Sequence, residues 1–144
     1  MKLSFSTLAC PFWSFSEIFS AAKDLGYNGI EIRGIEREMY APKVREFSNE
    51  NIPATMKRFK TANLEIPIFT SAAYIYDMDN KDAALKEAYD YVDLASNAGV
   101  KYIRVLGDKD IHQTIDININ PEFGLNNFNN ICKYAELKNV SVLI

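Results

Sequence analysis

The sequence predicts an α/β protein whose parallel sheet is built from about four βα units and a fifth strand. Short runs rich in β-branched residues alternate with segments whose apolar residues recur every three or four positions. The connections that lead into the strands are very short, whereas those that leave the strands are long. Strands separated by helices pair in parallel through right-handed crossovers. We therefore expect a single domain over residues 1–144.

The first βα unit has an alternating strand at residues 3–7 and a helix that begins at Phe15. Ser14 and Glu17 have the spacing of a capping box, in which each side chain accepts a hydrogen bond from the other residue's backbone. Gly26 suits the left-handed position that ends many helices. This unit therefore carries its own start and stop signals.

The second and third units repeat the pattern. Residues 29–33 form an expected strand, which a long loop connects to a helix at 51–62. The third strand is expected at 64–70, although Pro67 removes one donor from its hydrogen-bond ladder. The helix that follows, at 81–98, has one apolar face.

The fourth unit has a strand at 101–106 and a helix that Asn120 caps, with Pro121 as its first residue. Residues 140–144 are then expected to form a buried fifth strand. The inward face of the fourth helix is expected to hold Leu125, Phe128, Ile131, Cys132 and Ala135.

The composition narrows the class of protein. The hydrophobic fraction of 48% and the charged fraction of 24% are typical of a folded globular chain. A net charge of -3 without a basic stripe makes nucleic acid an unexpected partner. The sequence shows neither a membrane span nor a signal segment, so we expect a cytoplasmic location and no membrane partner. Cys10 and Cys132 are expected to be reduced.

Charged and aliphatic residues alternate in the second and fourth strands. Within 30–33 and 103–105 the aliphatic side chains share one parity, whereas Glu31, Arg33 and Arg104 share the other. Helices cover the aliphatic face, so the charged side chains point to the interior if the sheet is part of a (β/α)8 barrel. We predict this partial barrel, with an ion pair between Glu31 and Arg104. The pair either neutralises two buried charges or contacts a ligand.

The long loops after the strands mark the expected ligand site. Trp13 either forms a wall for a sugar ring or packs before the first helix cap, and Ser71 suits a polyol or phosphate pocket or an ordinary turn. Asp108 and His112 either bind a cation or substrate, with acid–base duty for the histidine, or are simply solvated. No residue stands out as catalytic, because Cys10 has no identifiable partner base.

Two stretches carry a family pattern, LGYNGIEIR at residues 25–33 and YIRVLG at 102–107. Together with their neighbours they resemble the sugar phosphate isomerase/epimerase family of the xylose isomerase-like TIM barrel superfamily. The resemblance covers the whole chain and implies the N-terminal half of an eight-stranded barrel. The residues that would then face a sugar or sugar phosphate are Trp13, Glu31, Arg33 and Arg104.

The resemblance also implies a metal-dependent reaction. The family uses a divalent metal, Mn or Mg, while a proton moves between adjacent carbons of a sugar or a related hydroxy-carbonyl compound. Its first metal ligand is usually a glutamate directly after a stretch like VSVLI, and none of its metal ligands matches a position in residues 1–144. We therefore expect no metal site and no turnover from this chain alone.

Three interpretations stay open at the level of sequence. The chain is half of a sugar isomerase or epimerase, either shortened or read from a short natural frame. Alternatively, it is a non-catalytic half-barrel that self-associates through open strand edges. The third interpretation is a small-molecule-binding flavodoxin-like domain. The sequence does not identify the substrate.

Overall fold

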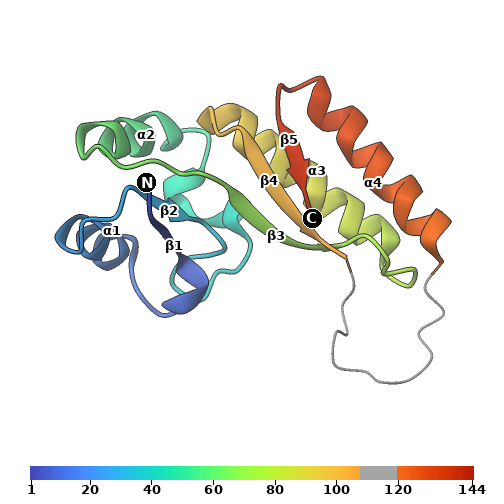
Figure 1. The fold of residues 1–144 in the computed structure, drawn as a ribbon, viewed down its shortest axis with the longest axis horizontal. Coiled ribbons are helices and arrows are strands. Elements are labelled where there is room, and N and C mark those ends of the chain that lie inside the picture. Colours follow the sequence, from blue (N-terminus) through green and yellow to red (C-terminus); the bar gives the residue numbers. More distant parts are fainter. Residues whose placement is uncertain (108–119) are drawn as a thin grey trace.

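Strands and helices alternate through the computed structural model of this chain, which describes residues 1–107 and 120–144 (Figure 1). The predicted order of elements is confirmed. Three short 3-10 helices, η1 to η3, lie in the loops after the first two strands. The strands are β1 (Ser4–Ser6), β2 (Gly29–Glu31), β3 (Phe69–Tyr74), β4 (Tyr102–Leu106) and β5 (Ser141–Leu143); the helices are α1 (Phe15–Asp24), α2 (Ile52–Thr61), α3 (Lys81–Ala98), α4 (Pro121–Glu136), η1 (Thr7–Ala9), η2 (Ala41–Lys43) and η3 (Arg45–Phe47).

All the strand pairs are parallel and follow the order of the chain. β1 and β2 form a two-stranded sheet, and β3, β4 and β5 form a three-stranded sheet with β4 in the middle. Parallel bridges from Gly29 to Glu65 and from Ile32 to Phe69 join β2 to the segment that contains β3. The predicted parallel sheet is therefore confirmed, and its strand order is that of part of a (β/α)8 barrel.

The helix ends follow the signals in the sequence. At the start of α1, Ser14 Oγ accepts a hydrogen bond from the Glu17 N–H at 3.3 Å, and Glu17 Oε2 accepts one from the Ser14 N–H at 2.7 Å. The predicted capping box is thus confirmed. The N–H of Phe123 donates to the side-chain oxygen of Asn120 at 3.1 Å, which caps α4 as expected.

The predicted bounds of the third strand are wrong. β3 begins at Phe69 rather than at residue 64, because Pro67 has no N–H to donate and the preceding segment touches β2 only at a single bridge. The strand continues to Tyr74, with an irregular register after Thr70. As a result Ser71, which the sequence placed in a loop, lies inside the strand.

Two predictions of burial near the end of the chain are also wrong. Leu125 is 57% exposed, and Gly124 and Asn127 occupy the buried face of α4 in its place. The aromatic ring of Tyr76 fills the space beside Gly124, where a Cβ atom would lie only 2.2 Å from the ring. The fifth strand is only partly buried, since Leu143 is 43% exposed and β5 pairs on one side only within the described residues.

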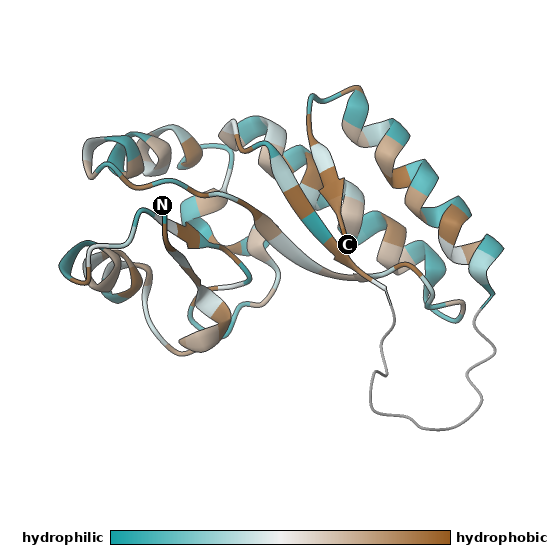
Figure 2. Cartoon of the chain, viewed as in Figure 1, coloured by the Kyte–Doolittle hydropathy of each residue, from teal (hydrophilic) through white to brown (hydrophobic). Residues whose placement is uncertain are grey.

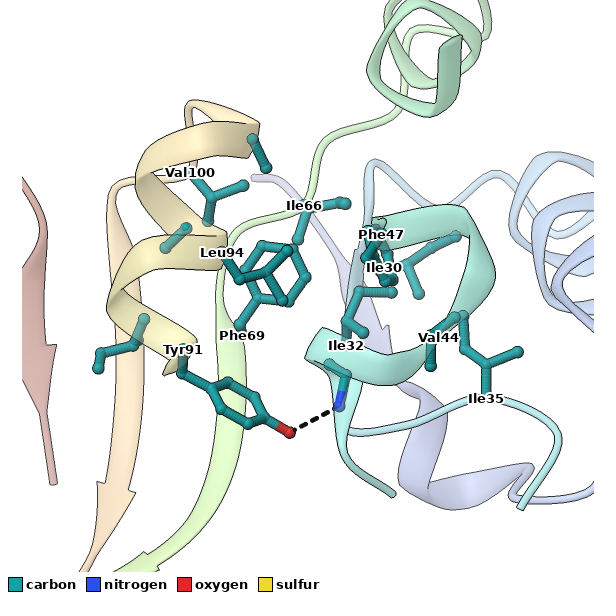
Figure 3. Close-up of a cluster of buried hydrophobic side chains, with 14 of the residues drawn as sticks. Ile30, Ile32, Ile35, Val44, Phe47, Ile66, Phe69, Tyr91, Leu94 and Val100 are labelled. Carbon is teal, nitrogen blue, oxygen red and sulfur yellow. Dashed lines mark hydrogen bonds between the residues drawn. The ribbon is translucent and has the colours of Figure 1, made fainter. Parts of the chain in front are cut away.

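The hydrophobic core lies between the sheet and the helices, where the strands place their aliphatic residues. Ile30 and Ile32 from β2 and its extension, and Ile103 from β4, are fully buried, as the alternation in the sequence predicts. The colouring of β4 in Figure 2 changes between brown and teal in the same way. Figure 3 shows Phe69 packed between this layer and Leu94 of α3.

Tyr91 connects α3 to the long loop after β2. Its hydroxyl accepts a hydrogen bond from the N–H of Ala41 at 3.0 Å, drawn in Figure 3, and donates to the carbonyl of Met39 at 3.3 Å. We expect Tyr91→Phe to lower the free energy of unfolding by about 1–3 kcal/mol, because it leaves a buried N–H without an acceptor. Urea denaturation measures this change.

Tyr89 supplies the control for that substitution. It lies on the same helix, is half-buried, and its hydroxyl makes no hydrogen bond within residues 1–107 and 120–144. Tyr89→Phe should therefore leave the free energy of unfolding nearly unchanged. Equal losses for the two variants would show that the Ala41 contact contributes nothing.

Candidate functional site

A row of side chains crosses the five strands on the face opposite the aliphatic core. Ser6 of β1 is in register with Glu31 of β2, and Thr70 of β3 is in register with Arg104 of β4. Arg104 is in register with Leu143 of β5. The Thr70 hydroxyl donates to Glu31 Oε1 at 2.8 Å and so connects the two halves of the row. We call these five residues the interior row.

The predicted ion pair between Glu31 and Arg104 is wrong. No nitrogen of Arg104 lies within 4.0 Å of an oxygen of Glu31, and the ion pairs of the described residues join other side chains. Thr70 explains the difference, because it lies on the strand between them and binds the carboxylate. Glu31 is half-buried, whereas the Arg104 side chain is exposed.

The segments that follow β1 and β2 are fixed to each other by hydrogen bonds. Thr7 is buried, and its hydroxyl oxygen accepts hydrogen bonds from the N–H groups of Arg33 at 2.9 Å and Gly34 at 3.2 Å. The Glu36 N–H donates to the carbonyl of Trp13 at 3.3 Å. The Trp13 side chain is 44% exposed, so part of it is open to solvent.

Arg33 has a structural contact of its own. Its Nη1 donates to the carbonyl oxygen of Met39 at 2.9 Å, which holds the loop after β2 against the strand. The guanidinium also lies beside the Tyr91 hydroxyl, where it favours ionisation. Burial outweighs this effect and raises the pKa of Tyr91 to about 12. Arg33 therefore positions the loop, and only part of its side chain is free for a ligand.

Ser71 and Cys10 are turned away from the candidate site. Ser71 is fully buried, and its hydroxyl donates to the carbonyl of Arg104 at 2.9 Å while accepting from the Ala73 N–H at 3.2 Å. Burial raises the pKa of the Cys10 thiol, which disfavours the reactive thiolate. The predicted substrate-binding residues Asp108 and His112 lie outside the described residues.

Thr70 is the member of the interior row that binds Glu31, and the sequence did not single it out as a site residue, nor did it single out Ser6 or Leu143. Thr70 shares its parity with Arg104 once β3 is taken to run from Phe69 to Tyr74. The prediction of a strand at 64–70 hid this signal, because Thr70 then shares its parity with the aliphatic Leu64, Ile66 and Ile68. The polar partner of Glu31 was therefore missed.

A charged cluster fastens the loop after β2 to α3 on the outer side. Tyr40 donates its hydroxyl proton to Asp90, which also accepts from Lys86. Burial opposes ionisation of Asp90, but the bonds from Lys86 and Tyr40 outweigh it and hold the pKa of this carboxyl below its usual range. Burial and the neighbouring carboxylate raise the pKa of Tyr40 well above the usual tyrosine range.

The lowered pKa of Asp90 predicts that the free energy of unfolding decreases in acid. Because its pKa is lower in the folded chain, its contribution is present above the ordinary value of 3.8 and is lost as the pH falls below it. Urea denaturation across this range should show a weaker acid dependence for Asp90→Asn than for the unchanged protein. Asp24→Asn, at an exposed position, is the control and should keep the full dependence. Identical pH profiles for all three proteins would contradict this prediction.

The described residues do not fit the divalent metal that the resemblance implies. Within residues 1–107 and 120–144 no group of three or more His, Cys, Asp and Glu side chains is placed to hold a metal ion. The carboxylate of the interior row, Glu31, stands alone next to a hydroxyl rather than within a ligand set. In this part of the chain the interior row therefore presents polar and charged side chains without a metal-ligand group around them.

Comparisons with known proteins show the fold. No protein-family model and no curated protein matches the sequence. In the described part no helix is long and apolar enough to cross a membrane. Among solved structures, the IolI protein with a binding zinc atom has a TM-score of 0.76 at 17% identity, over 99% of this chain and 50% of that one.

Two further solved structures have a similar fold. A probable 3-DHS dehydratase, AsbF of Bacillus anthracis, has a TM-score of 0.74 at 20% identity, over 100% of this chain and 52% of that one. D-psicose 3-epimerase of Clostridium cellulolyticum H10, solved with D-tagatose, has a TM-score of 0.71 at 16% identity. This match covers 99% of this chain and 51% of that one. Proteins described as xylose isomerases also match. The chain spans about half the length of these proteins, and it has the fold of half of a xylose isomerase-like TIM barrel.

Proposed function

We propose that the chain binds a sugar or sugar phosphate on the interior face of its strands, as one half of the pocket of an isomerase or epimerase. The observation that carries this proposal is the interior row, in which the Thr70 hydroxyl donates to Glu31 at 2.8 Å beside an exposed Arg104. The epimerase solved with D-tagatose has the same fold, which supports a sugar as the ligand class.

The interior row has the donors and acceptors that a sugar needs. One Glu31 oxygen accepts from Thr70, which leaves the second carboxylate oxygen to accept hydrogen bonds from sugar hydroxyls. The Arg104 guanidinium donates in a planar fork that suits a carbonyl, a pair of hydroxyls or a phosphate. The exposed indole of Trp13 offers an apolar surface for the C–H face of the ring.

The proposal assigns sugar binding, and no proton transfer, to these residues. The family resemblance implies Mn²⁺ or Mg²⁺, and the described residues contain no ligand group for either ion. We expect no conversion of a ketohexose by this chain when either metal is added. Metal-dependent epimerisation by the chain alone would contradict this part of the proposal. The cytoplasmic location, the single domain and the absence of a nucleic-acid partner stay predictions.

Calorimetric titration with D-tagatose tests the binding. We expect Arg104→Gln to weaken binding by about 10- to 100-fold, the usual effect of losing hydrogen bonds from a charged group. Arg45→Gln is the matched control, because Arg45 is 86% exposed in η3, away from the interior row. Equal affinities for the two variants, or no binding of D-tagatose or D-fructose by the unchanged chain, would contradict the proposal.

A further inference from the structure

The interior row carries opposite charges on either side of Thr70. Glu31 lies on β2 and Arg104 on β4, one strand away from Thr70 in each direction. Neighbouring strands lie about 4.8 Å apart, so the two charged residues start roughly 10 Å apart along the row. Thr70 holds the carboxylate, and Arg104 makes no ion pair within residues 1–107 and 120–144. The row therefore carries a carboxylate and a guanidinium that do not pair with each other.

This arrangement of charges is complementary to itself. A two-fold axis that runs parallel to the strands beside Thr70 places β2 of one copy opposite β4 of the other. Glu31 of each copy then faces Arg104 of the other, and the two contacts are identical by symmetry. Two sheets packed face to face lie about 10 Å apart, a gap that a glutamate and an arginine span from opposite sides.

The face that carries the row is open to such a partner at β4 and β5, whereas Thr70 is buried and Glu31 is half-buried. In Figure 1, β4 and β5 lie in front of α3, so the view is onto the side of the sheet that this helix does not cover. Arg104 and Leu143, neighbours in the row, are both exposed there. The helices instead cover the side that holds the buried Ile103 and Val105.

We propose that the interior face binds the same face of a second copy of this chain, with Glu31 of each protomer paired with Arg104 of its partner. The dimer goes beyond the proposed sugar binding and competes with it, because each pair takes up the Glu31 and Arg104 groups that the sugar would contact. Charge pairs across such an interface act mainly on specificity, since like charges brought opposite each other are strongly unfavourable.

Charge-reversed variants test the pairing in the absence of any sugar. Light scattering of the unchanged chain should give twice the monomer mass of 16.4 kDa. Glu31→Arg places two arginines opposite each other, and Arg104→Glu places two glutamates opposite each other. Each variant alone should dimerise at least about 100-fold more weakly. An equimolar mixture of the two variants should recover the dimer, because every contact in the mixed dimer joins opposite charges.

The mixture separates this proposal from a contact within one chain. The double variant E31R/R104E would be rescued in either case, whereas rescue between two chains occurs only if the residues meet across an interface. Arg45→Glu is the control and should dimerise like the unchanged chain, because Arg45 lies outside the row. If the reversed variants lose their fold by circular dichroism, the neutral pair E31Q and R104Q replaces them. Each should weaken the dimer, and their mixture should recover it in part, because the mixed dimer keeps one contact between Glu31 and Arg104.

Three results would overturn the proposal. A chain that stays at 16.4 kDa at all concentrations has no such dimer. If both charge-reversed variants still dimerise, the dimer uses another surface. The same follows if Arg45→Glu abolishes the dimer. If the chain is a monomer that still binds D-tagatose, the dimer proposal is wrong and the sugar proposal stands. If the chain is a dimer that binds no sugar, the sugar proposal is wrong and the dimer proposal stands.

Discussion

Phe69→Ala is expected to lower the free energy of unfolding by about 3–5 kcal/mol. Phe69 is fully buried at the start of β3, where its ring packs edge-on against Phe47 with centroids 5.2 Å apart. Its backbone also forms the bridge to Ile32 that joins β2 to β3. Truncation leaves a cavity at the place where the helical loop after β2, α3 and the sheet meet (Figure 3).

Urea denaturation measures this loss, and Phe12→Ala is the matched control. Phe12 is 70% exposed, and its main contact is the Arg37 guanidinium 5.1 Å from the ring centroid. An exposed cation–π contact contributes about 0.5–1 kcal/mol, so the control should cost several-fold less. Equal costs for the two substitutions would mean that Phe69 does not connect the two parts of the core.

Gly34→Ala should also destabilise the chain strongly, by about 1–3 kcal/mol or more. A Cβ atom at this position would lie 2.4 Å from the Glu38 carbonyl oxygen and 2.7 Å from the Met39 Cα atom. Both neighbours are backbone atoms of a tight turn, in which Glu36 and Arg37 already have positive φ angles of 52° and 71°. The turn cannot yield without breaking the contacts that fix the ends of β1 and β2.

Gly107→Ala is the control for this substitution. A Cβ atom there meets nothing within 4 Å, and its φ angle is not in the left-handed region. Alanine restricts the unfolded chain, so this variant should be neutral or more stable by about 0.4–1 kcal/mol. Thermal denaturation of both variants gives the comparison. A Gly34→Ala protein as stable as Gly107→Ala would show that the turn is free to move.

The sequence predicts those features of the fold that depend on local patterns. Alternation in β2 and β4 separates the buried Ile30 and Ile103 from the charged Glu31 and Arg104, because strand side chains alternate between two faces. The helix caps are also local, since the Ser14 capping box depends on residues three positions apart. These features were predicted correctly.

Features that depend on the register between strands could not be predicted. The prediction of an ion pair between Glu31 and Arg104 was wrong because Thr70 binds the carboxylate. This contact joins residues 39 positions apart. Ser71 is buried because β3 runs from Phe69 to Tyr74, which places Ser71 on the same face as Phe69, and the sequence did not predict these bounds. In this chain the local sequence predicts which face of the sheet a side chain is on. Which residue it contacts depends on how the strands pair.

The central claim is that the interior row is the sugar-contacting surface, and chemical-shift mapping with D-tagatose tests it most directly. We predict that the largest changes in backbone and side-chain signals occur at Glu31, Thr70 and Arg104, with the Trp13 indole among them. Another hollow lies between α1 and α2, where Arg45 and Arg58 line its surface. Changes centred on that hollow, or no changes at the interior row, would contradict the claim.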